Sequence, residues 1–147
     1  MVRYTSEFDW VREQVAEFEA SGGTRANTLW DTDDPIVVVT STGARSGAER
    51  KNPVMRVTRD GAYLAIASLG GGPDNPSWYY NLVADPVVQL QDGAVRREYR
   101  ARLLDGDERA EWWAFAVETW PTYAEYQKTT SRQIPVFLLE PTAGLPG

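Results

Sequence analysis

Hydrophobic side chains recur along the chain with two different periods, and the changes of period mark the predicted elements. Near the start they recur at helical spacing, which predicts an amphipathic helix over residues 6–20. Ser6 suits its N-cap position, and Gly22–Gly23 follow it as a stop signal. The buried face of this helix is expected to carry Phe8, Val11, Val15 and Phe18.

From residue 36 onward the apolar residues come in short β-branched and alternating runs separated by turn signals, which is typical of strands. Asp60–Gly61 and Asp92–Gly93 are strong hairpin signals. Six strands are predicted, at residues 36–42, 52–59, 62–68, 87–91, 94–104 and 135–140.

Three further helices are predicted between the strands. The first begins with Asn75 as its cap and Pro76 at its first helical position. The second spans residues 107–119, and Pro121 ends it. The third begins with residues 122–125, which resemble a capping box.

Antiparallel hairpins with helices inserted between them predict the fold class α+β. We expect a small antiparallel barrel of six strands, closed or partly closed, with flanking helices, rather than a Rossmann sheet. The chain is expected to be one domain overall. Within it, residues 1–35 form the N-terminal helix and an irregular segment, residues 36–141 form the barrel and residues 142–147 form a tail.

The composition excludes several classes of protein. The 147-residue chain has no Cys and no His, which excludes Ser-His-Asp hydrolases, cysteine proteases and zinc enzymes, so no metal site is expected. A net charge of −6 argues against nucleic-acid binding. No apolar run approaches the roughly 18 residues of a membrane-spanning helix, and the N-terminus lacks a signal-peptide core. We expect a cytoplasmic protein, with peripheral attachment to a membrane left open.

The positive charge is concentrated in one segment. Between residues 45 and 59 a single acidic residue, Glu49, stands against five basic ones, a local charge of +4. The five are Arg45, Arg50, Lys51, Arg56 and Arg59. The segment begins in a polar turn at residues 43–47. Gly43 and Gly47 let this turn bend sharply, so that backbone N–H groups can converge on an anion. A solvated hairpin turn with scattered basic residues explains the segment about equally well.

Two other segments have side chains suited to a binding site. Ala67–Ser68 precede a glycine run, where a flat ring can lie close to the backbone, although a loop that only turns a corner is the favoured interpretation of this segment alone. Trp120, Tyr123 and Tyr126 are spaced by three. Such a stripe is more often core than site, but the tyrosine hydroxyls need partners and make a pocket wall plausible.

Taken together, these segments resemble the deazaflavin-dependent nitroreductase family of actinobacteria, whose members are split-barrel flavin/deazaflavin oxidoreductases that use coenzyme F420. The resemblance runs from about Ile36 to Pro141. The matching motifs are Thr42-Gly-Ala-Arg-Ser-Gly47, Arg50 with Asn52-Pro53, Ala67-Ser68 with Gly70-Gly71, Asn75-Pro-Ser-Trp-Tyr79 with Asn81-Leu82, Tyr123-Ala-Glu-Tyr-Gln127 and Arg132-Gln-Ile-Pro135.

The resemblance implies a six-stranded split β-barrel of the FMN-binding type, and it also implies roles for individual residues. The phosphate and oligoglutamate tail of the cofactor would be held by Arg45, Ser46, Arg50 and Lys51. The deazaflavin ring would be bordered by Asn52, Pro53, Ile66, Ala67, Ser68 and Leu69 on one side and by Ser77, Trp78, Tyr79 and Asn81 on the other. The acceptor pocket would be lined by Met55, Ser68, Trp120, Tyr123 and Tyr126.

The reaction implied by the resemblance is hydride transfer from reduced coenzyme F420 to a quinone, an enone or a nitro-type acceptor. Ser68, Tyr123, Tyr126 or water would then protonate the product. Met55 and Trp120 stand where nitroimidazole-reducing relatives have tyrosines, so we expect little prodrug activation. The partners expected are a small electron acceptor and a second copy of the chain in a homodimer. An FMN-dependent split-barrel oxidoreductase and a non-catalytic deazaflavin carrier are the alternatives.

Overall fold

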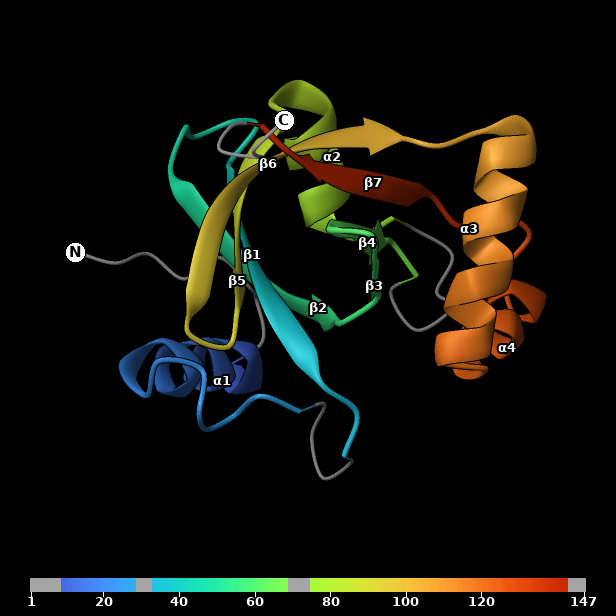
Figure 1. Ribbon diagram of the computed structural model, residues 1–147. Helices are drawn as coiled ribbons and strands as arrows, with labels where there is room; N and C mark the ends of the chain where they lie inside the picture. The colour runs from blue at the N-terminus through green and yellow to red at the C-terminus, as the bar shows by residue number, and fades with distance from the viewer. Residues whose placement is uncertain (1–8, 29–32, 69–74, 143–147) are drawn as a thin grey trace.

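One curled antiparallel sheet organises the structure, a computed structural model that describes residues 9–28, 33–68 and 75–142. The sheet has seven strands and forms a half-barrel, and four helices surround it in this part of the chain (Figure 1). The prediction of an α+β fold built on an antiparallel barrel is confirmed. Within the described ranges, none of the helices is both long enough and apolar enough to cross a membrane.

The elements follow the order predicted from the hydrophobic pattern. The helices are α1 (Asp9–Ala20), α2 (Ser77–Ala84), α3 (Gly106–Thr119) and α4 (Thr122–Lys128). The strands are β1 (Ile36–Thr42), β2 (Glu49–Met55), β3 (Thr58–Arg59), β4 (Ala62–Ile66), β5 (Val87–Asp92), β6 (Val95–Leu103) and β7 (Val136–Pro141). Their order across the sheet is β2-β1-β5-β6-β7-β4-β3, and all neighbours are antiparallel.

The sheet has seven strands instead of six because the predicted strand at 52–59 is divided at Arg56–Val57. At this point the chain leaves its partner β1 and pairs with β4. The N–H of Arg56 donates to Pro35 (3.0 Å), and the carbonyl of Val57 accepts from Leu64 (2.9 Å). The sequence did not reveal the break, since both halves have strand-forming residues.

This break explains why the sheet curls. β2 and β3 are the two edge strands, yet only Arg56–Val57 separate them in the sequence. Seven strands at about 4.8 Å spacing span roughly 29 Å when flat, whereas three steps of the chain reach at most about 11 Å. The two edges must therefore lie close together.

Three apolar clusters occupy the inside and two outer sides of the curled sheet. The inner cluster packs β1 and β4–β7 against α2, and Phe137 and Leu139 are among its buried residues. The second packs β4 and β7 against α3 and α4. The third packs Val15 and Phe18 of α1 against Ile36 and Val38 of β1. Figure 1 shows the corresponding arrangement, with α1 on one side of the sheet and α3 and α4 together on another.

Helix boundaries differ from the prediction at two starts. Pro76, not Asn75, is the N-cap of α2, and Pro121 precedes α4 in the same way; neither helix has a side-chain capping hydrogen bond. The prediction of Asn75 as a cap is wrong because its Oδ1 accepts a hydrogen bond from Arg132 instead (2.8 Å). In α1, Val15 and Phe18 are buried as predicted. Ser6, Phe8 and the side chain of Val11 lie outside what the structure describes.

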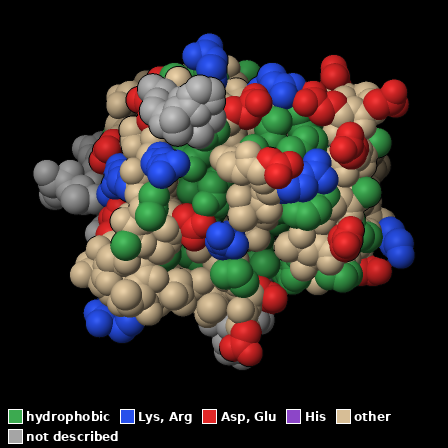
Figure 2. Space-filling model, in the orientation of Figure 1, with side chains coloured by type: hydrophobic (Ala, Val, Ile, Leu, Met, Phe, Trp, Pro, Cys, Tyr) green, Lys and Arg blue, Asp and Glu red, His purple; other side chains and the backbone are tan. Residues whose placement is uncertain are grey.

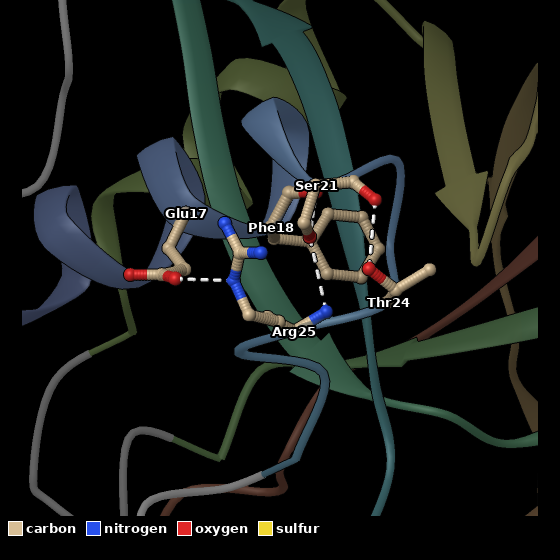
Figure 3. Close-up of polar contacts among 5 residues, drawn as sticks. All are labelled: Glu17, Phe18, Ser21, Thr24 and Arg25. Atoms are coloured by element: carbon tan, nitrogen blue, oxygen red, sulfur yellow. Dashed lines mark hydrogen bonds and ion pairs between the residues drawn. The ribbon is translucent and has the colours of Figure 1, made fainter.

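The end of α1 is fixed by short polar contacts (Figure 3). The Ser21 hydroxyl donates to the Phe18 carbonyl (3.1 Å) and accepts from the N–H of Arg25 (3.0 Å). Arg25 also pairs with Glu17 (2.6 Å). The chain then passes so close to the β5–β6 turn that a Cβ at Gly23 would overlap the carbonyl oxygen of Gly93. Gly23 is thus needed both for this approach and for its φ of 80°.

We expect Gly23→Ala to lower the free energy of unfolding by about 3 kcal/mol, because the added methyl group forces α1 and the β5–β6 turn apart. Gly22→Ala is the matched control, since Gly22 has a φ of 63° but open space around it. It should cost only about 1 kcal/mol. Urea denaturation of both variants measures the difference, and equal losses would show that the close approach is not tight.

Candidate functional site

A turn with two arginines joins β1 to β2, and we call residues 43–50 the basic turn. Gly43 donates to Ala48 (2.7 Å) and Gly47 donates to Gly43 (2.9 Å), which closes the turn. The Ser46 hydroxyl accepts from the N–H of Ala48 (3.1 Å) and from Nη2 of Arg50 (3.2 Å). A Cβ at Gly43 would lie 2.8 Å from Nε of Arg50, so the guanidinium lies directly over the turn.

The other three basic residues of the segment 45–59 are engaged elsewhere. Lys51 pairs with Glu19 of α1, at 2.8 and 3.0 Å. Arg56 pairs with Asp92 (2.8 Å), and Arg59 lies over the ring of Trp112 at 4.1 Å. The face in Figure 2 accordingly shows basic and acidic side chains interspersed, with apolar side chains between them.

Arg45 and Arg50 are therefore the two basic side chains of this segment without a carboxylate partner among the described residues. Arg45 is exposed and Arg50 is half-buried. Both belong to the basic turn, where a hydroxyl and two guanidinium groups are suited to phosphate or carboxylate oxygens.

Strand geometry corrects the predicted roles of Lys51 and Pro53. Directly opposite residues of an antiparallel pair lie on the same face, and Lys51 lies opposite Thr40 while Pro53 lies opposite Val38. Val38 belongs to the cluster under α1. Lys51 and Pro53 thus lie on the α1 face, away from Arg50, and Lys51 is a buried partner of Glu19 rather than part of the basic turn.

Arg50 and Asn52 lie on the opposite face of β2. They are paired with Ser41 and Val39, and Val39 belongs to the inner cluster beside α2. Asn81 of α2 reaches the same region, where its Oδ1 accepts a hydrogen bond from the N–H of Ala44 (2.9 Å). The structure thereby brings Arg45, Ser46, Arg50 and Asn81 to one end of the curled sheet, with Asn52 two residues further along the same face of β2.

The aromatic residues at the start of α2 are partly core residues. Trp78 and Tyr79 pack against Phe137 of β7, with ring centroids 6.0 and 5.7 Å apart. Both are only partly buried, and Ser77 is exposed. These residues hold α2 on the inner cluster and keep part of their surface accessible.

The end of β4 offers one accessible side chain of the predicted set. Ile66 and Ala67 are buried, and the backbone of Ala67 is fully used: its N–H donates to Pro135 (2.9 Å) and its carbonyl accepts from Arg132 (3.0 Å). Ser68 is half-buried. Leu69 lies outside the described residues.

Four of the five residues predicted to line the acceptor pocket, all except Ser68, belong to one apolar cluster or pack against it. Met55, Trp120 and Tyr126 pack against it from outside, and Tyr123 is a buried member. The Trp120 ring meets those of Tyr123 and Tyr126 edge-on, at 4.9 and 5.7 Å. Burial raises the pKa of Tyr123. This placement favours Tyr123 as a wall of the cluster over Tyr123 as a proton donor.

Arg132 is the residue whose position sequence reasoning did not explain. Its guanidinium donates to the carbonyls of Ala67 (3.0 Å) and Ser68 (2.7 Å) and to Oδ1 of Asn75 (2.8 Å). These partners lie at least 57 residues away in sequence. The presence of Arg132 in one of the motifs quoted above was its only signal.

Comparisons with known proteins bear on the family and the fold of the chain. The family model described as F420H(2)-dependent quinone reductase matches residues 10–141. A putative F420H(2)-dependent quinone reductase of Mycobacterium tuberculosis, Rv3178, is 33% identical over 107 residues, covering 73% of this chain and 90% of that protein. A solved F420-H2 dependent reductase, FDR-A, is 50% identical with a TM-score of 0.69, covering 76% of this chain and 99% of its own.

A further solved structure bears on assembly. It is described as a domain-swapped dimer and is 48% identical to this chain, with a TM-score of 0.72. The match covers 92% of this chain and 100% of the other.

We expect Lys51→Met to lower the free energy of unfolding by about 2 kcal/mol, because it leaves the largely buried Glu19 carboxylate with only the more distant Arg96 guanidinium (3.9 Å) as a partner. Adding Glu19→Leu should restore most of this loss, since the remaining pair is then apolar. Urea denaturation of the wild type, both single variants and the double variant gives the four free energies of unfolding of a double-mutant cycle. A double variant that loses the sum of the two single effects would contradict the assignment.

Proposed function

Because the chain belongs to the F420H(2)-dependent quinone reductase family, we propose that it is an oxidoreductase that transfers a hydride from reduced coenzyme F420 to a quinone. When bound, the reduced cofactor supplies a hydride, which together with one proton converts a quinone to its hydroquinone. The chain has no Cys or His of its own to supply nucleophilic or acid–base chemistry. Its residues therefore bind and orient the cofactor and the quinone, and a hydroxyl group or water supplies the proton.

The basic turn is the observation that carries this proposal. The tail of the cofactor is a phosphate followed by glutamate carboxylates, and the turn carries the exposed Arg45 together with Arg50 and the Ser46 hydroxyl, which are hydrogen-bonded to each other (3.2 Å). Gly43 has no Cβ, so the Arg50 guanidinium lies against the turn backbone. The donor set of this turn fits a chain of anionic groups.

The flat part of the cofactor fits the region between the basic turn and the end of β4. Asn52 lies on the same strand face as Arg50, and Ser68, two residues after β4, has a half-buried side chain. The exposed Ser77 and the partly buried Trp78 belong to the start of α2. We assign these polar groups and the indole to the ring, with Ile66, Ala67 and Tyr79 as the packed support behind it.

The acceptor is assigned to the surface formed by Met55, Trp120 and Tyr126. It is aromatic and apolar, which suits a flat quinone better than a polar nitroimidazole. The proton that completes the reduction comes from the Tyr126 hydroxyl, from Ser68 or from water. Tyr123 is not assigned this role because its side chain is buried within the apolar cluster.

The chain is also expected to form a homodimer. The homodimer is proposed because a 48% identical relative is described as a domain-swapped dimer.

Two alternative functions are less favoured. An FMN-dependent enzyme is less favoured because FMN has one phosphate where the basic turn offers two arginines. A deazaflavin carrier is less favoured because the relatives are named reductases. Turnover with a quinone distinguishes the enzyme from a carrier.

Arg45→Ala and Arg50→Ala should each weaken binding of F420 by about 1–3 kcal/mol, because each removes a charge-assisted contact to the tail. Wild-type affinity should also fall as salt rises and should exceed the affinity for FMN. Arg25→Ala is the control, since Arg25 is exposed beyond the far end of β1 and pairs with Glu17. Isothermal titration gives all the values. Equal affinity for FMN, or unchanged binding by both variants, would place the tail elsewhere.

Trp120→Ala should lower kcat/KM for a quinone about tenfold while F420 affinity stays within a factor of two, because the lost indole stacks on the acceptor. Trp112→Ala is the matched control. Trp112 packs on the same cluster but contacts Arg59 and Phe115 instead. Steady-state kinetics and titration test the assignment. Loss of F420 binding in Trp120→Ala with full turnover at saturating cofactor would overturn it.

A further inference from the structure

Arg132 contacts two segments that lie more than fifty residues before it in the sequence. Its Nη1 donates to the Ala67 carbonyl (3.0 Å) and to Oδ1 of Asn75 (2.8 Å), and its Nη2 donates to the Ser68 carbonyl (2.7 Å). Ala67 and Ser68 follow β4, whereas Asn75 immediately precedes the Pro76 cap of α2. The planar guanidinium therefore links the end of β4 to the start of α2.

The backbone of Arg132 is itself held by α4. Gln127 of α4 donates from Nε2 to the Arg132 carbonyl (2.8 Å), and its Oε1 accepts from the N–H of Ile134 (3.0 Å). Tyr126 is the neighbour of Gln127 on this helix. The contacts thus connect the helix that carries Tyr126 to the strand end that carries Ser68.

We propose that Arg132 is a positioning residue for hydride transfer, and this proposal rests on the proposed function. Arg132 holds Ser68 and the start of α2, which form the ring side of the site. It fixes their position relative to α4, which carries the acceptor side. Arg132 acts through the segments it holds, because its guanidinium donates to two backbone carbonyls and an amide oxygen. A lysine carries the same charge but cannot span three acceptors with one ammonium group.

Arg109 provides the matched control. It is half-buried like Arg132, and its Nη2 donates to the Ile134 carbonyl (2.6 Å) in the same segment before β7. Its guanidinium lies over the ring of Trp113 (5.1 Å). Arg109 therefore stabilises this segment without contacting Ser68 or Asn75, so that its replacement reports the effect of local destabilisation alone.

The experiment compares Arg132→Lys, Arg109→Lys and wild type by thermal melting, titration with oxidised F420, circular dichroism of the bound F420 chromophore, and kinetics with a soluble quinone. Arg132→Lys should raise the Kd for F420 at least fivefold, reduce the induced dichroism and lower kcat about tenfold, with KM for the quinone within threefold of wild type. Arg109→Lys should lower Tm by a similar amount but leave Kd, dichroism and kcat within twofold.

Arg132→Lys with Kd and dichroism within twofold of wild type would overturn the proposal, as would equal changes in Arg109→Lys. If Arg132→Lys is too unstable to measure, Asn75→Ala removes one arm of the contact and should shift Kd and dichroism in the same direction. Wild-type protein that binds F420 but reduces no quinone would refute the proposed function separately. In that case Kd and dichroism alone still decide the role of Arg132.

Discussion

Closure of the sheet at Arg56–Val57 is the constraint on which the remaining structure depends. The chain crosses there from one edge strand to the other, so the sheet has to curl and acquires an inside and an outside. The inside is filled by one apolar cluster that also seats α2, whereas the outside carries α1 on one flank and α3 with α4 on another. The basic turn, the end of β4 and the start of α2 owe their positions to this closure.

The same geometry distributes the charges of the basic segment. Neighbouring residues of a strand face opposite sides, so Arg50 lies with the inner face while Lys51 lies with α1 and pairs with Glu19. Arg56 pairs with Asp92, which also accepts a hydrogen bond from Tyr63 (2.6 Å). Burial and this hydrogen bond raise the pKa of Tyr63 to about 12. What remains for an anionic ligand is a compact pair of arginines on a tight turn.

Much of the fold could be predicted from the sequence because its signals are local. Hairpin turns at Asp60–Gly61 and Asp92–Gly93, β-branched runs and the helical spacing of Val15 and Phe18 each report on a few neighbouring residues. What the sequence could not show depends on distant partners. By sequence, Lys51 is one of several basic residues in the segment 45–59. Its role is determined by its ion pair with Glu19, which lies 32 residues away.

In the candidate site, too, local signals could be predicted from the sequence and contacts between distant residues could not. The motifs indicated which segments carry it, and the structure places the basic turn beside α2 and Trp120 beside Tyr126. Arg132 had no interpretable signal beyond its motif, because its side-chain acceptors among the described residues come from segments far away in the chain. Tyr123 was indistinguishable from Tyr126 by spacing, and only burial separates the two.

The central claim is that the basic turn recognises the anionic tail of coenzyme F420. The most direct measurement compares the Kd of the wild-type protein for F420 with its Kd for the same deazaflavin without phosphate and glutamates, whose ring is identical. The account predicts binding of F420 at least a hundredfold tighter at low salt, with the difference shrinking as salt rises. Equal affinity for the two molecules at every salt concentration would contradict it.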